Sequence, residues 1–320
     1  MSDALLDLIR AILSQPTAPY YEGAVRGEIL QHLGQLPHVS TALDDFGNLI
    51  AHYRRGDAPA RFALAAHMDH PGYVGEDFLG GVPESYRIKQ PPTRDFGAFS
   101  MWDLPACELD GGRVYSRACD DLIGCAAIVA TLRELERSGS EANVRGLFTR
   151  AEEVGFVGAM QLAQSGCVPR EVTIISLECS SEKGGPAKMG EGAILRVGDR
   201  TSIFDPEVTA TLGEVAKRAG IPVQRLLMSG GTCEATAYQL YGYRCGALCV
   251  ALGNYHNCGP DETIAPEFVS LDDVRGLVRW CVEIARCTAP PDAASVDLRD
   301  RLEKRAAESI ARFGGRPGAV

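Results

Sequence analysis

Four apolar stretches of this chain each lead into a residue that can bind a metal ion. The stretches FALAA, GLFTRA, VTIISL and CVALGNY have the length and composition of buried strands. In open α/β sheets the carboxyl ends of parallel strands meet at one edge, so side chains far apart in the sequence are expected to converge there. With three further residues from the adjoining loops, the candidates are His67, Asp69, Asp120, Glu152, Glu153, Glu178 and His256.

The hydrophobic pattern alternates between strands and helices along most of the chain. Residues 121–139 and 271–287 have helical spacing, whereas 143–151, 171–179 and 245–253 are typical of buried strands. Such alternation predicts a three-layer α/β/α fold with a central mixed, mostly parallel sheet that is covered on both faces.

Two segments break this alternation and suggest a domain division. Residues 1–78 and 113–292 are expected to form one discontinuous catalytic domain, and 293–320 a charged C-terminal helix with a flexible tail. Residues 79–112 are rich in glycine, proline and aromatic residues, which predicts a short β-type insertion that is either a lid or a subunit interface. Its large apolar side chains are Phe96, Phe99, Met101 and Trp102.

Composition excludes several classes of partner. The formal net charge of −10 argues against nucleic acid and against an anionic membrane surface. No segment approaches the run of about 18 apolar residues that spans a bilayer, and the N-terminal residues predict an amphipathic helix, not a signal peptide. The 11 cysteines are scattered and lie mostly in apolar runs, which favours reduced thiols in a cytoplasmic protein.

Two imidazoles with several carboxylates are a ligand set for a pair of divalent ions. Asp120 precedes a helix and could bridge two ions, and its neighbour Asp121 could cap that helix. Glu153 would bind one ion while Glu152 takes the proton from a water shared by the ions and passes it to the leaving nitrogen. Asp69 would orient an imidazole or the general base, or it would simply cap a loop. The alternative for Glu152 and Glu153 is an ordinary solvent-exposed turn.

A glycine motif offers a candidate substrate contact. Gly230, Gly231 and Thr232 stand at the expected start of a helix, where free backbone N–H groups could bind a substrate carbonyl or carboxylate. A plain tight turn explains the motif equally well. The proposed metal chemistry requires no role for His70, which is expected either to line the pocket or to be exposed.

Seven motifs in fixed order resemble the glutamyl aminopeptidase (tetrahedral aminopeptidase) family of co-catalytic metallopeptidases. They are APYYEGAVRGEI, DDFGNLIAHY, HMDHPGYV, CDDLIGCA, AEEVGFVGA, GGTCEATA and NYHN. The resemblance implies two divalent ions, zinc in the first place with cobalt or manganese as alternatives, and removal of N-terminal residues from peptides. It also implies Glu152 as general base, Asp69 as the acid that supports it, Asp120 as the bridge, and as metal ligands His67, Asp120, Glu153, Glu178 and His256.

The chain departs from the family pattern in four places. His70 stands where an acidic residue is usual, and GGTD becomes GGTC with Glu234 one position later. Glu178 stands where Asp is more usual. The insertion between HMD and CDD is shorter than the family's dimerisation domain, which predicts a small homo-oligomer, a dimer and not a dodecamer.

Three functions are compatible with these observations. The first is a metal-dependent aminopeptidase acting on short peptides. The second is a carboxypeptidase or N-deacylase of the same superfamily, with Arg94 holding a substrate carboxylate. The third is a non-catalytic binding protein, against which the intact acidic pair of Glu152 and Glu153 argues.

Overall fold

The main sheet determines the shape of the molecule in the computed structural model, which describes residues 2–88, 93–183, 185–289 and 293–312. Its eleven strands are β1 (Val39–Leu43), β2 (Leu49–Arg55), β3 (Phe62–His67), β8 (Glu108–Asp110), β9 (Arg113–Ser116), β10 (Ala142–Thr149), β11 (Thr173–Ser181), β12 (Ala193–Gly198), β13 (Val223–Leu227), β14 (Cys245–Gly253) and β15 (Glu267–Ser270). Their order is β1-β2-β10-β3-β11-β14-β15-β9-β8, and β12 and β13 branch from β14.

The centre of this sheet is parallel. Strands β10, β3, β11 and β14 are parallel neighbours, and the strands that flank them are antiparallel. Parallel strands that are covered on both faces are continuously apolar, which is the pattern of these four segments. The α/β fold with a mixed, mostly parallel central sheet is therefore confirmed.

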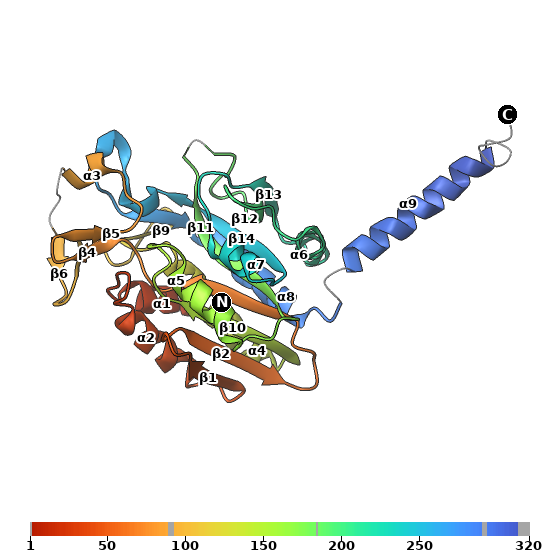
Figure 1. Ribbon diagram of the computed structural model, residues 1–320, viewed down its shortest axis with the longest axis horizontal. Coiled ribbons are helices and arrows are strands. Elements are labelled where there is room, and N and C mark those ends of the chain that lie inside the picture. Colours follow the sequence, from red (N-terminus) through yellow and green to blue (C-terminus); the bar gives the residue numbers. More distant parts are fainter. Residues whose placement is uncertain (1, 89–92, 184, 290–292, 313–320) are drawn as a thin grey trace.

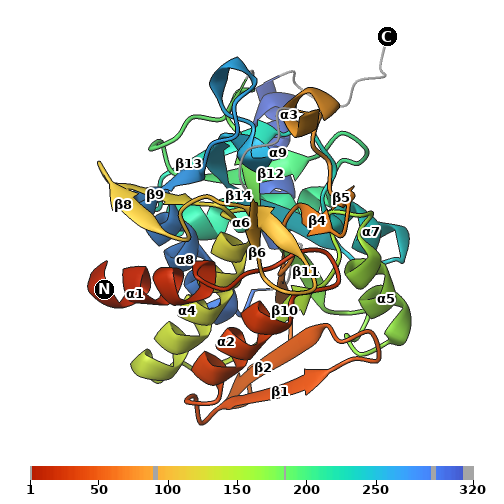
Figure 2. The same cartoon turned by 90° about the vertical axis from the view of Figure 1, so that its left-hand side faces the viewer.

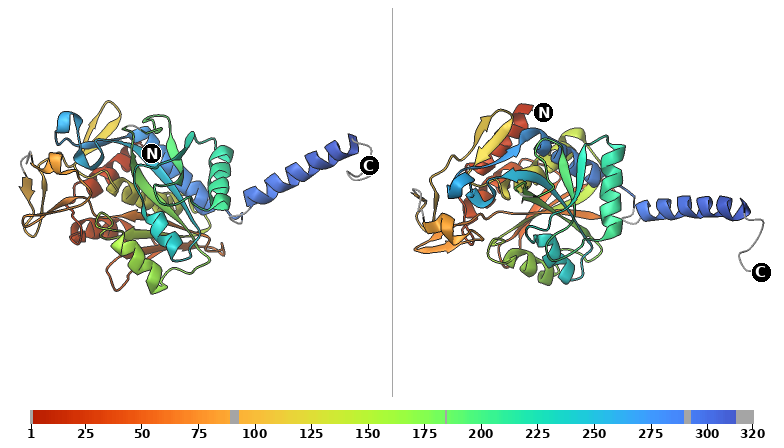
Figure 3. Two further views of the ribbon diagram at one scale, coloured as in Figure 1. Left: turned by 45° about the horizontal axis from the view of Figure 1, so that its top comes forward. Right: turned by 90° about the horizontal axis from the view of Figure 1, so that it is seen from above.

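Helices cover both faces of the sheet (Figure 3). Along β3, Phe62, Leu64 and Ala66 pack toward one core, and Ala63 and Ala65 toward the other, as the two-residue period of a strand requires. The helices on the first face are α1 (Ser2–Leu13), α2 (Gly23–Leu33), α4 (Leu122–Ser138), α6 (Pro206–Arg218) and α8 (Leu271–Arg286). The helices on the second face are α5 (Val157–Ser165) and α7 (Glu234–Leu240).

A small antiparallel sheet lies at the end of the molecule opposite the C-terminal helix (Figure 1) and faces the viewer in Figure 2. Its strands, in spatial order, are β5 (Asp77–Leu79), β4 (Gly72–Val74), β7 (Ser100–Trp102) and β6 (Thr93–Asp95), and α3 (Glu84–Ile88) follows β5 in sequence. The large side chains of this region do not form an exposed cluster. Met101 and Trp102 are buried, and Phe99 stacks on both Phe96 and Tyr21.

The C-terminal helix α9 (Ala293–Arg312) projects from the body (Figure 1). It contacts α6, and Arg218 pairs with Asp297 at 3.7 Å. The expected flexible tail, 313–320, falls outside the described residues, and the division into domains stays a prediction. Among the described residues, no helix has the length and apolar character needed to cross a membrane.

Candidate metal centre

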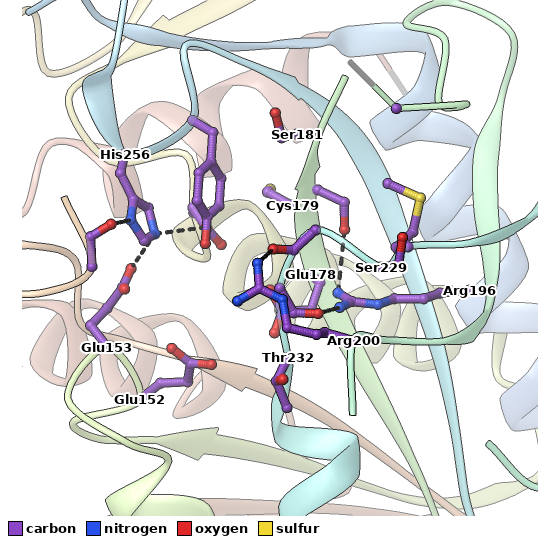
Figure 4. A pocket seen from close by; sticks show the side chains of 18 of the residues that line it. Glu152, Glu153, Glu178, Cys179, Ser181, Arg196, Arg200, Ser229, Thr232 and His256 are labelled. Atoms are coloured by element: carbon purple, nitrogen blue, oxygen red, sulfur yellow. Dashed lines mark hydrogen bonds and ion pairs between the residues drawn. The ribbon is translucent and has the colours of Figure 1, made fainter. Parts of the chain in front are cut away.

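The carboxyl ends of the four central strands open into a cavity of about 670 Å³ (Figure 4). His67 is the last residue of β3, and its neighbour in the sheet, Thr149, is the last residue of β10 and precedes Glu152. His256 lies beyond β14 in the short 3₁₀ helix η1 (Tyr255–Asn257), which is followed by η2 (Pro260–Glu262). Glu178 lies inside β11 and not at its end, because that strand continues to Ser181.

Asp120 belongs to three groups of potential ligands, with Asp121 and Cys179 in one of them and with a histidine in each of the other two. The two groups with a histidine are the better candidates for a divalent ion bound by imidazole and carboxylate. One group is His67, Asp120 and Glu178, the other is Asp120, Glu153 and His256, and the ligand atoms within each group lie within 4.8 Å of one another. Asp120 Oδ1 is 3.5 Å from His67 Nε2, and its Oδ2 is 3.6 Å from His256 Nε2. Donors around a tetrahedral zinc ion are about 3.3 Å apart, given bonds of roughly 2.0–2.1 Å.

Several donor atoms of these groups lack any other partner. Asp120 Oδ1, Glu153 Oε1 and His256 Nε2 are buried and have no hydrogen-bond partner among the described residues. Glu153 Oε1 and His256 Nε2 face each other as an ion pair at 3.1 Å. Buried polar atoms are nearly always paired, so these three atoms need an explanation. A divalent cation between them supplies one, and the residues present therefore fit a metal centre.

Both candidate imidazoles are oriented in the same way. His67 Nδ1 donates to the carbonyl of Asp69 at 3.0 Å, and His256 Nδ1 donates to the carbonyl of Gly81 at 3.2 Å. With the proton on Nδ1, each Nε2 faces Asp120 with a free lone pair. This is the usual arrangement of a metal-ligating histidine.

The electrostatics of the cavity favour bound cations. Burial, with a smaller contribution from the Asp120 carboxylate, raises the pKa of Glu178 to about 8. Burial also raises the pKa of Glu152 well above its ordinary value, with Glu178 and Glu153 adding to the effect. Although burial opposes it, the neighbouring imidazoles of His256 and His67 lower the pKa of Asp120. So many carboxylates close together repel one another unless positive charge is present.

Asp69 binds the backbone of the acidic pair, Glu152 and Glu153. Its side chain is fully buried, with Oδ1 accepting from Glu152 N at 2.9 Å and Oδ2 from Glu153 N at 3.1 Å. Asp69 Oδ1 is also 3.6 Å from His67 Nδ1. One carboxylate thus fixes the backbone of both glutamates and lies beside an imidazole. A third group with a histidine, formed by His67, Glu152 and Glu153, arises from the same arrangement.

Two further residues near Asp120 have structural partners. Asp121 caps α4 as expected, because its side chain accepts from Gly124 N at 3.1 Å. His70 is fully buried and not exposed. Its Nδ1 donates to the carbonyl of Asp120 at 2.7 Å, and its Nε2 lies 3.1 Å from Asn257 Oδ1.

The predicted glycine motif lines the cavity. The carbonyl of Gly230 accepts from Arg200, and the carbonyl of Gly231 accepts from Arg196 Nη2 at 3.2 Å. Thr232 Oγ1 contacts Thr201 Oγ1 at 2.6 Å. Helix α7 begins two residues later than expected, at Glu234, and is one of the shortest helices of the fold.

Three basic side chains in the cavity lining, here called the basic wall, were not predicted from the sequence. Lys183, Arg196 and Arg200 line the cavity, and Figure 4 shows Arg196 and Arg200 across from Glu152. Arg196 is buried, with Nη1 donating to Ser180 Oγ at 3.3 Å and Nε without a hydrogen-bond partner among the described residues. The signal for it was a single arginine within the apolar strand AILRVG. Arg94 does not line the cavity and lies over Phe96 at 5.6 Å.

Comparisons with known proteins give relatives in sequence. A predicted aminopeptidase of Acetivibrio thermocellus is 31% identical over 182 residues, which cover 55% of this chain and 52% of the relative. The chain spans about half or less of the length of the curated relatives it matches.

Two solved structures share the fold. A TET1 peptidase of Pyrococcus horikoshii has a TM-score of 0.72 at 21% identity, with 88% of this chain and 99% of that chain covered. An aminopeptidase of the archaeon Desulfurococcus kamchatkensis has a TM-score of 0.75 at 20% identity, with 91% and 96% covered. The model of the M42 glutamyl aminopeptidases matches residues 95–270, more than half of the 320-residue chain. The chain therefore belongs to the M42 glutamyl aminopeptidase family.

Proposed function

We propose that this protein is a metal-dependent aminopeptidase that removes N-terminal residues from short peptides. The observation that carries the proposal is Asp120, whose two oxygens each face one imidazole and which joins two ligand groups beside a buried acidic pair. Family membership supports the same activity, as does the name of the curated relative, although the chain spans only about half of that protein.

The proposed ligands divide into two sets. His67, Asp120 and Glu178 would hold one divalent ion, and Asp120, Glu153 and His256 the other. When bound, such ions polarise a carbonyl oxygen and lower the pKa of a water molecule. Zinc is the expected metal, and cobalt and manganese also suit a mixed imidazole and carboxylate set.

Glu152 would move the protons. Its carboxylate takes a proton from the attacking water and delivers it to the nitrogen of the departing amine. Burial raises the pKa of Glu152, which brings a carboxylate closer to the range in which a general base works at neutral pH. Asp69 fixes its position through the backbone N–H of Glu152.

The basic wall indicates which substrates fit. Arg196 and Arg200 place positive charge across the cavity from the acidic pair (Figure 4), and Lys183 lines the same cavity. A guanidinium group binds a carboxylate strongly and with defined geometry. We therefore infer a preference for an acidic N-terminal side chain, in keeping with the family's description.

The same wall also supports the second candidate, a carboxypeptidase or N-deacylase. In that case Arg196 and Arg200 would bind the substrate's terminal carboxylate, the role that the sequence suggested for Arg94. The two candidates differ in one requirement: an aminopeptidase needs a free amine on its substrate.

We also propose that the protein is a cytoplasmic homo-oligomer. Its eleven cysteines are all free thiols, in keeping with a reducing compartment. The Pyrococcus horikoshii peptidase, by its title, can assemble into a tetrahedron or a large octahedral shell. For this chain we expect a dimer, because the segment between HMD and CDD is short.

One experiment tests the activity. Glutamyl, aspartyl, leucyl and alanyl arylamides are compared with the matching N-acetyl amino acids and N-acetyl dipeptides, which have a free carboxylate. Each substrate is tested after chelation and again after adding Zn²⁺, Co²⁺ or Mn²⁺. We expect metal-restored hydrolysis of the arylamides, fastest with the acidic ones. Hydrolysis of the acetylated substrates alone would favour the carboxypeptidase or deacylase. Protein that carries ions and cleaves neither kind of substrate would contradict both enzymes.

A further inference from the structure

Glu267 joins the two loops that carry Asp120 and His256. It is the first residue of β15 and is fully buried. Its Oε2 accepts from the backbone N–H groups of Cys119 at 2.7 Å and Asp120 at 3.0 Å, and its Oε1 accepts from His256 N at 2.8 Å. Two of these three donors are the N–H groups of proposed metal ligands.

The sheet explains why one residue can reach both loops. Strand β15 pairs with β9, where Glu267 lies opposite Ser116, and with β14, where Val269 lies opposite Leu252. Strand β9 leads into the Asp120 loop and β14 leads into η1. Glu267 therefore lies on a strand that is paired with both β9 and β14, the strands that lead into the Asp120 loop and the His256 loop.

The backbone at His256 needs support. Its φ of 52° lies in the left-handed region, where residues other than glycine are held only by their surroundings. The bond from His256 N to Glu267 is one such restraint. His70 adds a second connection between the loops, since it contacts the carbonyl of Asp120 and the side chain of Asn257.

We propose that Glu267 is a positioning residue that holds Asp120 and His256 at the separation required by the second cation. The inference rests on the ligand sets of the proposed function. A carboxylate can accept from all three N–H groups, whereas a glutamine places an NH₂ group against at least one of them. Glu267→Gln therefore keeps the size of the side chain and removes the match between acceptors and donors.

The test is titration of the metal-free full chain with Zn²⁺ or Co²⁺ by calorimetry. For Glu267→Gln we expect the affinity for one of the two ions to fall about 10–100-fold, the usual effect of losing a residue that orients a metal ligand. Glu267→Asp, which keeps the charge on a shorter side chain, should recover part of the loss. In Glu153→Gln protein, which already lacks a ligand of that ion, the Glu267 substitution should add less than it does alone.

Asp273 provides the matched control. It is also buried, and its oxygens accept from Gly190 N at 2.7 Å and Gly192 N at 2.9 Å, away from the cavity lining. Asp273→Asn should lower the Tm and leave both metal affinities unchanged. Equal losses of affinity in both variants would overturn the inference, since the effect would then be general destabilisation.

The remaining outcomes are also decisive. If Glu267→Gln binds both ions as the parent does, Glu267 does not position the ligands. If that variant fails to fold, Glu267→Asp is the test, and parent-like affinity in it overturns the inference. If the parent chain itself binds no ions, it is the proposed metal centre that fails, and not the role of Glu267 alone.

Discussion

Replacing Glu152 by glutamine tests the central chemical assignment. The side chain keeps its shape, and its backbone N–H still donates to Asp69 Oδ1 at 2.9 Å. Glu152 belongs to none of the ligand groups that contain Asp120. The variant should therefore bind both ions and substrate normally while losing the group that moves the proton.

The size of the effect follows from general base catalysis, which contributes roughly 10²–10⁴-fold to a rate. At about 1.36 kcal/mol per tenfold, this corresponds to a loss of roughly 2.7–5.4 kcal/mol of transition-state stabilisation. We expect the loss in kcat with an unchanged KM. The variant should also be at least as stable as the parent without metal. Burial, followed by the charges of Glu178 and Glu153, raises the pKa of Glu152, and glutamine carries no charge that burial or repulsion could disfavour.

The assay is steady-state hydrolysis of a glutamyl arylamide, with bound metal measured on the same samples. Glu153→Gln is the contrast, because it should lose one ion. Parent-like kcat in Glu152→Gln would refute Glu152 as the base. Loss of an ion in that variant would instead show that the third group, His67 with Glu152 and Glu153, holds metal.

The remaining predictions concern pH, specificity and assembly. Burial raises the pKa of Glu178 to about 8 from an ordinary value of 4.5, so the metal-free folded state keeps a proton that the unfolded chain releases between these values. The Tm of metal-free protein should thus fall as pH rises from about 5 to 8, and a flat Tm would contradict this. Metal should abolish that fall and raise the Tm, because it binds the folded state. Arg200→Met should lower kcat/KM for glutamyl more than for leucyl substrates, whereas Arg94→Met should not. Light scattering should give the mass of two chains, and a mass near twelve would exclude the dimer.

The convergence of the proposed ligands could be predicted, because the carboxyl ends of neighbouring parallel strands lie at the same edge of the sheet. His67 and Glu152 follow adjacent parallel strands, and the register places His67 opposite Thr149. Glu178 shows the limit of this reasoning. Its strand continues for three more residues, paired with β14. The apolar pattern does not define where this pairing stops, so the sequence alone placed the strand end too early.

The packing of the insertion could not be predicted from its composition. Met101 and Trp102 are equally consistent with an interface, a lid or a small core, and the sequence does not say what covers them. In the structure they pack within their own chain, where Met101 Sδ accepts from Thr17 N at 3.5 Å. That contact joins residues far apart in sequence, and no local pattern indicates it.

The residues that hold the ligands in place were the hardest to recognise, and the reason is chemical. Asp69 and Glu267 accept hydrogen bonds from backbone N–H groups, which every residue except proline supplies. A metal ligand must be one of a few residue types, so it leaves a signature in the sequence. A backbone donor leaves none, and only the acidic partner is visible. The sequence indicates Asp69 because it lies two residues after His67. Glu267 has no such neighbour and lies far from Asp120 in the chain.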